Sequence, residues 1–147
     1  MMEFKQKQEI LKAFGIPSLI DGIKDAEVEL ANLEKELLDL TTASYGYIGN
    51  RSGDCEVVKE LEAELFLKAP EFSGEGKKAT VDEKKAWLVT QRSQDKRLKE
   101  ARVKQKEVDF LLEDCQNRLE QTKRTLNRMM SLLRIREAQI RFLASEV

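Results

Sequence analysis

Few side chains in this 147-residue chain are of the kinds that perform catalysis. Histidine is missing, which removes the commonest general base and a frequent metal ligand. The two cysteines, Cys55 and Cys115, are 60 positions apart and do not have the spacing of a zinc site. Because Cys115 falls on an apolar helical repeat, we expect it to be a buried structural thiol. These residues predict neither a catalytic centre nor a metal centre.

One glycine- and lysine-rich stretch, GEGKK at 74–78, has the composition of a phosphate-binding loop without its motif. Glu71 stands where that motif has glycine, and Lys78 stands where it has serine or threonine. The abundant carboxylates lie at the spacing of salt bridges on helix surfaces. We therefore expect no cofactor and no enzymatic activity.

The sharpest pattern is a row of cations between positions 84 and 106, a range that contains nine basic and two acidic residues. Four of them follow one another at intervals of seven, which places them on one outward side of a helix. The pattern predicts either a solvated helix face or a surface for phosphates or for an acidic protein. The candidate residues of this basic stripe are Lys85, Arg92, Lys96, Lys99, Arg102 and Lys106.

A second candidate site interrupts the helical repeats at 44–54, which reads SYGYIGNRSGD. Three of the seven glycines and both tyrosines fall in these eleven positions. One interpretation is a flexible joint that lets two short helical arms follow one long helix. The other is a contact loop, because loops on rigid helices often perform recognition. Its candidate partner-binding residues are Tyr45, Tyr47, Ile48 and Arg51.

The elements that position these residues are all expected to be helical. Apolar residues recur at steps of three and four from 23 to 40 and from 98 to 147, the pattern of a coiled coil. Ser18 is expected to cap the second helix, and Thr80 with Glu83 forms a capping box for the last. Residues 90–95 are polar and offer Ser93 as a further cap, so the long helix is expected to kink or restart there. The expected elements are a short helix at 3–14, a helix at 19–43, the glycine-rich joint at 44–54, a helix at 55–68, a loop at 69–79 and a long helix at 80–147.

Charge predicts how the two halves pair. Residues 19–40 hold seven acidic and two basic residues, whereas 118–141 hold seven basic and two acidic residues. The opposite signs favour antiparallel pairing of the N-terminal arm with the last helix, although each exposed pair is weak. The predicted fold is all-α: a single helical domain, 1–147, formed by an elongated antiparallel hairpin or coiled coil with one very long C-terminal helix and an interrupted N-terminal arm.

Composition indicates the compartment and the assembly. The net charge is −1, no run reaches the roughly 18 apolar residues of a membrane span, and the N-terminus shows no secretory pattern. We expect an intracellular protein that makes no contact with membranes. Apolar residues beside the main stripe, such as Leu111, Met130 and Ile135, predict a homo-oligomer through residues 108–147.

The C-terminal half resembles a known group of proteins. The segments APEFSGEGKKATVDEKKAWL, from Ala69, and LNRMMSLLR, from Leu126, look like those of small coiled-coil accessory proteins of bacteriophages and integrated mobile elements. The resemblance implies the cytoplasm of a bacterial host cell. It also implies a protein partner: the chain would assist phage recombination or replication, or inhibit a host nuclease or defence system. The alternatives are a nucleic-acid-binding accessory that uses 84–106 and a purely structural coiled-coil scaffold.

Overall fold

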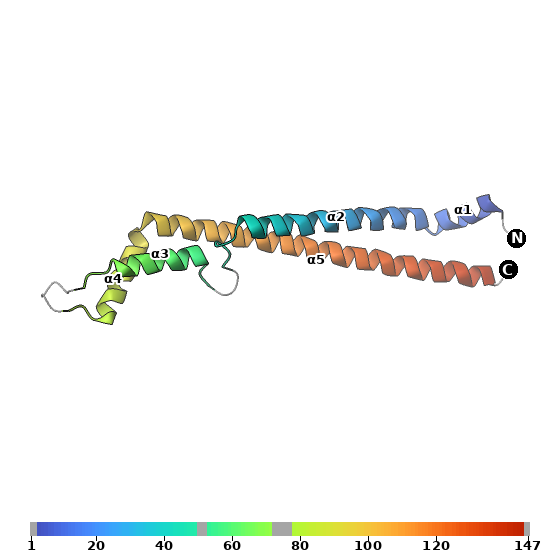
Figure 1. The fold of residues 1–147 in the computed structure, drawn as a ribbon. Coiled ribbons are helices and arrows are strands. Elements are labelled where there is room, and N and C mark those ends of the chain that lie inside the picture. The colour runs from blue at the N-terminus through green and yellow to red at the C-terminus, as the bar shows by residue number, and fades with distance from the viewer. Residues whose placement is uncertain (1–2, 50–52, 72–77, 146–147) are drawn as a thin grey trace. The chain divides into compact units, whose positions relative to one another are not determined.

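The structure is a computed structural model that describes residues 3–49, 53–71 and 78–145. Within these residues the chain forms helices and no β-strand, so the all-α prediction is confirmed (Figure 1). The helices are α1 (Phe4–Ala13), α2 (Ile16–Ala43), α3 (Glu56–Leu67), α4 (Val81–Gln94) and α5 (Lys96–Ser145). No helix in the described part is long and apolar enough to cross a membrane.

The first two helices are separated at Gly15. This residue has a φ of 68°, in the left-handed region that glycine adopts without strain. The Leu19 N–H donates to the Gly15 carbonyl at 3.0 Å, so α2 begins at Ile16. The expectation that Ser18 caps this helix is wrong, because Pro17 is tolerated inside the first turn, where its missing N–H has no helical partner.

Two caps define α4 and α5. The Thr80 hydroxyl accepts from the Glu83 N–H at 3.2 Å, as the capping-box motif predicts. A second cap interrupts the expected helix over 80–147: Asp95 has extended backbone angles, and its carboxylate accepts from the Leu98 N–H at 2.9 Å. The long helix is therefore two helices. The break lies in the polar segment identified from the sequence, but its cap is Asp95, while the Ser93 hydroxyl donates to the Thr90 carbonyl.

The helices form two compact units, which are described separately. Unit 1 consists of residues 1–37 and 114–147. In it α1 and α2 run antiparallel to α5 (Figure 1). The Cys115 thiol lies 3.6 Å from the Leu33 carbonyl, and the Arg136 guanidinium donates to the Phe14 carbonyl. The residue numbers of the contacting pairs thus increase along one arm as they decrease along the other. This is the antiparallel order that the charges predict.

Unit 2 consists of residues 38–113. Its core is built by α3, α4 and the first turns of α5, with α3 packed on α4. Val58 and Leu98 are almost fully buried in it, and Trp87 packs against its edge. The buried members of the core are Cys55, Val58, Leu65, Leu88, Leu98 and Ala101.

Burial along the apolar stripe of α5 decreases toward the C-terminus. Its members are buried up to Thr122, except Gln105 and Leu119, which are half-buried. Beyond Thr122 the side chains of Leu126, Met129 and Leu133 are only half-buried, and Leu143 is 50% exposed. The C-terminal end of unit 1 therefore has apolar surface that α1 and α2 do not cover.

Candidate functional site

The glycine-rich segment after α2 begins with a tight turn. The Tyr47 N–H donates to the Ser44 carbonyl at 2.9 Å, and Gly46 has a φ of 93°. The Val57 N–H, in the first turn of α3, donates to the Gly46 carbonyl at 3.0 Å. The start of the segment, at Gly46, is thus hydrogen-bonded to Val57, which follows the end of the segment.

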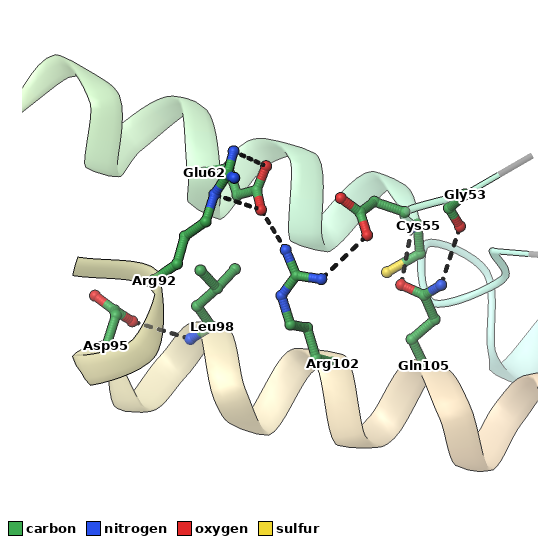
Figure 2. Close-up of polar contacts among 9 residues, drawn as sticks. Gly53, Cys55, Glu62, Arg92, Asp95, Leu98, Arg102 and Gln105 are labelled. Carbon is green, nitrogen blue, oxygen red and sulfur yellow. Dashed lines mark hydrogen bonds and ion pairs between the residues drawn. The ribbon is translucent and has the colours of Figure 1, made fainter. Parts of the chain in front are cut away.

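The return of the segment is fastened to α5 by Gln105. Its side-chain oxygen accepts from the Cys55 N–H at 3.0 Å, and its side-chain nitrogen donates to the Gly53 carbonyl at 3.0 Å (Figure 2). Gly53 has a φ of 100°, which turns its carbonyl toward the glutamine without strain. We refer to this pair of bonds, between Gln105 and residues 53 and 55, as the Gln105 clamp.

Gly49, in the first half of the segment, lies directly against the Gln105 clamp. Its N–H donates to the Asp109 carboxylate at 3.0 Å. A Cβ on Gly49 would lie 2.0 Å from the Gln105 side-chain nitrogen and 2.5 Å from the Gly53 carbonyl oxygen. Only glycine fits there, because one of the two obstructing atoms belongs to the backbone. The described parts of 44–54 are therefore pinned to α5, which argues against the flexible-joint interpretation.

The two tyrosines of this segment have different surroundings. Tyr45 is 79% exposed. Tyr47 packs against the core of unit 2, and the Lys104 ammonium lies 4.2 Å from the centre of its ring, a cation–π geometry. Ile48 is half-buried, and Arg51 lies outside the described residues. Of the three candidate contact residues that the structure describes, Tyr45 is the most exposed, and Tyr47 has a structural role.

The predicted basic stripe is divided between structural and exposed cations. Glu62 of α3 lies between two of its arginines: Arg92 contacts both Glu62 oxygens, at 3.1 and 3.2 Å, and Arg102 pairs with Glu62 and with Asp54 (Figure 2). Glu62 is only 17% exposed, so these pairs are less screened than surface ones. The arginines join α4 and α5 to α3.

The lysines of the stripe remain at the surface. Lys96 pairs with Glu100 on its own helix at 3.8 Å, and both side chains are largely exposed. Lys85, Lys99 and Lys106 are exposed and make no ion pair with the residues that the structure describes. Arg97, a flanking cation, lies 3.7 Å from Glu64 of α3. The structure thus brings the predicted stripe residues together in unit 2 but leaves three free lysines rather than a continuous basic face.

Cys115 has the buried position that the repeat predicts, with no exposed surface. Burial, with a smaller contribution from the nearby Glu36 carboxylate, raises the pKa of the Cys115 thiol. Its neighbour Arg118 donates to Glu36 at 3.0 Å, and that bond raises the pKa of the Arg118 guanidinium. A protonated, inaccessible thiol is a poor nucleophile. Among the described residues no group of three or more acidic or cysteine side chains could hold a metal ion.

Two residues that hold these segments together were not recognised as functional from the sequence. Gln105 has the spacing of the apolar stripe of α5, and Glu62 is one of several acidic residues of α3. The available signal was the polarity of Gln105 at an inward position, since a buried amide requires hydrogen-bond partners. Comparison of the chain with protein-family models, with curated proteins and with solved structures finds no match.

Proposed function

We propose that this chain is a non-enzymatic interaction protein that acts by binding a host or phage protein, as an inhibitor or as an accessory factor. The observation that supports this proposal is an exposed tyrosine on a fastened loop: Tyr45 is 79% exposed, while the segment beside it is bonded to α5 through Gln105 and Asp109. The resemblance of the C-terminal half to coiled-coil accessory proteins of phages and mobile elements agrees with such a role in a bacterial cytoplasm.

A fastened loop is a favourable binding element for a physical reason. Association costs free energy when a mobile loop becomes ordered, and a loop that is already held avoids most of that cost. Tyrosine is among the residues that most often dominate interface energies, because its ring buries a large area and its hydroxyl still forms a hydrogen bond. Tyr45 therefore has the chemistry of an interface anchor.

The surface next to the loop extends the proposed contact. Lys104, which lies over the Tyr47 ring, also borders a shallow groove of about 360 Å³ on α5. The other residues that line this groove are Lys99, Glu100, Val103 and Glu107. Val103 is 57% exposed, so the groove offers an apolar floor with charged sides of both signs. A protein surface with a mixed rim suits it better than a uniformly charged polymer.

The test uses the chain as bait in lysate of a bacterial host, with three matched forms. Wild type, Tyr45→Ala and Leu67→Ala are immobilised at equal density; Leu67 is 85% exposed at the end of α3 and serves as the control. We expect a protein retained by wild type and by Leu67→Ala but lost with Tyr45→Ala, with a dissociation constant about 30-fold higher for a 2 kcal/mol anchor. Equal retention by all three forms would contradict the proposal.

Nucleic-acid binding is the second candidate, because Lys85, Lys99 and Lys106 are exposed and free of ion pairs with the described residues. Three phosphate contacts predict that the logarithm of affinity falls with the logarithm of salt with a slope of about −3. Replacing all three lysines with glutamine should abolish such binding, and Tyr45→Ala should leave it unchanged. If the chain is a purely structural scaffold, the third alternative, neither the lysine replacements nor Tyr45→Ala should impair its function.

A further inference from the structure

Large apolar side chains are exposed at the end of unit 1 where α1 lies against the C-terminal turns of α5. Two come from α1: Phe4 is 74% exposed and Leu11 is 39% exposed. Two come from α5: Ile135 is 55% exposed and Phe142 is 62% exposed. Such a concentration of exposed apolar residues on a small unit marks an interaction surface.

The α5 residues form a second apolar stripe beside the one that faces α2. Leu132, Ile135, Gln139 and Phe142 follow one another at steps of three, four and three, the spacing of a coiled-coil seam. Toward the N-terminus the same spacing leads to polar residues, Arg128 and Thr125. The second stripe is therefore confined to the last turns of the helix, opposite α1.

Hollows lie next to these protruding side chains. A groove of about 420 Å³ between α1 and α5 is lined by Ile10, Leu11 and Ile140 among others. A second hollow is lined by Ile135, Ala138 and Phe142. Phe14 and Leu143 border both hollows, whereas the other lining residues differ. The second hollow and the exposed Ile135 and Phe142 thus lie on the same side of α5, and an apolar projection beside an apolar hollow is the condition for self-complementarity across a two-fold axis.

The charges of unit 1 indicate how a second copy would be oriented. The α2 segment 16–37 holds six acidic and two basic residues, and the α5 segment 114–145 holds seven basic and three acidic residues. A two-fold axis parallel to the helices places the α5 of one copy over the α2 of the other. An axis perpendicular to the helices places α5 over α5, with repulsion between two basic segments. Charge complementarity therefore selects the parallel axis.

We propose that a second copy of this chain covers the apolar end of unit 1 and forms an antiparallel four-helix bundle. In the bundle each basic α5 segment lies between its own acidic α2 segment and that of its partner, and Ile135 and Phe142 become buried. The proposal narrows the homo-oligomer expected through 108–147 to the last turns of α5, and it is independent of the role of Tyr45.

The test compares two double variants of the full chain by sedimentation equilibrium at tens of micromolar. Ile135→Gln with Phe142→Gln removes the second stripe. Val103→Gln with Phe110→Gln is a matched control on the same helix, with the same spacing of seven and exposures of 57% and 70%. We expect wild type and control at twice the 16.9 kDa chain mass. The dimer dissociation constant of the first variant should rise by about a hundred-fold or more, with an unchanged helical spectrum.

Salt distinguishes the arrangement. If each α5 lies against the partner's α2, the dissociation constant of the dimer rises as salt is increased from roughly 50 to roughly 500 mM, because the attraction between opposite charges is screened. A constant that falls with salt would overturn the α5-to-α2 arrangement. Monomeric wild type, or equal weakening by both double variants, would overturn the proposal as a whole.

Discussion

The Gln105 clamp offers a direct test of whether the segment at 44–54 is held in place. Gln105→Leu removes both hydrogen bonds while supplying the apolar side chain that the surrounding repeat favours. Each hydrogen bond contributes about 0.5–1.5 kcal/mol net, so the loss of two costs about 1–3 kcal/mol. The cost should lie in the upper half of that range, since Cys55 is 1% exposed and its N–H would be left without an acceptor.

Burial of the leucine offsets part of this loss. Gln105 is half-buried, so the new side chain gains about 1 kcal/mol at most. We therefore expect a net loss of about 1–2 kcal/mol. Guanidinium unfolding followed by circular dichroism measures it, and hydrogen exchange of a peptide covering 44–49 measures the release of the loop. Gln116→Leu, at an exposed position of the same helix, is the control and should change neither quantity.

A second variant separates the two bonds. Gln105→Glu keeps an oxygen that accepts from Cys55 but places a carboxylate oxygen against the Gly53 carbonyl. The loss of stability should therefore be present at pH 7 and should diminish toward about pH 4, where the acid protonates and donates to Gly53. If Gln105→Leu unfolds at the wild-type midpoint and the loop exchanges no faster, the clamp contributes nothing and the argument for a fastened loop fails.

Further predictions concern the residues around the two candidate sites and the buried thiol. Tyr47→Ala should cost about 2–4 kcal/mol, because the ring packs on the core of unit 2 and meets Lys104; thermal unfolding beside Tyr45→Ala, which should be neutral, checks this. Glu62→Gln should cost about 1–2 kcal/mol in denaturant unfolding, since it leaves Arg92 without a charged partner and Arg102 with Asp54 alone, both arginines being about 40% exposed. Asp95→Ala should cost about 1 kcal/mol and increase exchange in the first turn of α5, as expected for a lost N-cap. Because burial raises the pKa of Cys115, its contribution is complete below the unfolded thiol pKa and is lost above about pH 8.5; Cys115→Ala should flatten that fall in stability.

The sequence predicted those parts of the fold that follow from local periodicity and capping chemistry. The Thr80 hydroxyl caps α4 as predicted, and the stripe of α5 is buried from Leu98 to Thr122 except at the half-buried Gln105 and Leu119. Cap identity was less predictable where several candidates adjoin. Ser93 and Asp95 can both cap a helix, and the choice depends on which backbone is extended. Gly15 allows α2 to begin earlier than Ser18, because a positive φ ends α1 at once.

The polar members of the α5 stripe explain what periodicity could not predict. Spacing placed Gln105 and Arg136 inward but did not identify their partners, which are more than 45 residues away in sequence. Both side chains bind backbone where the opposing arm is interrupted: Gln105 at Gly53 and Cys55, and Arg136 at the Phe14 carbonyl beside Gly15. In each case a polar inward residue satisfies backbone groups that an interrupted helix leaves open. Thr122, the short polar member of the stripe, instead donates to the Arg118 carbonyl of its own helix, so it is the long polar side chains that mark a break in the facing helix.

In the basic stripe the arginines form ion pairs within the chain and most lysines remain exposed. This difference has a physical basis and bears on the choice between the proposed functions. Arginine presents several donors in a rigid fork, so Arg92 and Arg102 can share the carboxylate of Glu62. Lysine is a strongly hydrated point charge and gains less from partial burial, which agrees with Lys99 and Lys106 remaining in solvent. The planar, bidentate groups that suit phosphate recognition are thus occupied within the chain. What remains free beside them is a set of separate lysines and an exposed tyrosine on a fastened loop, and the tyrosine makes a protein partner the stronger hypothesis for this surface.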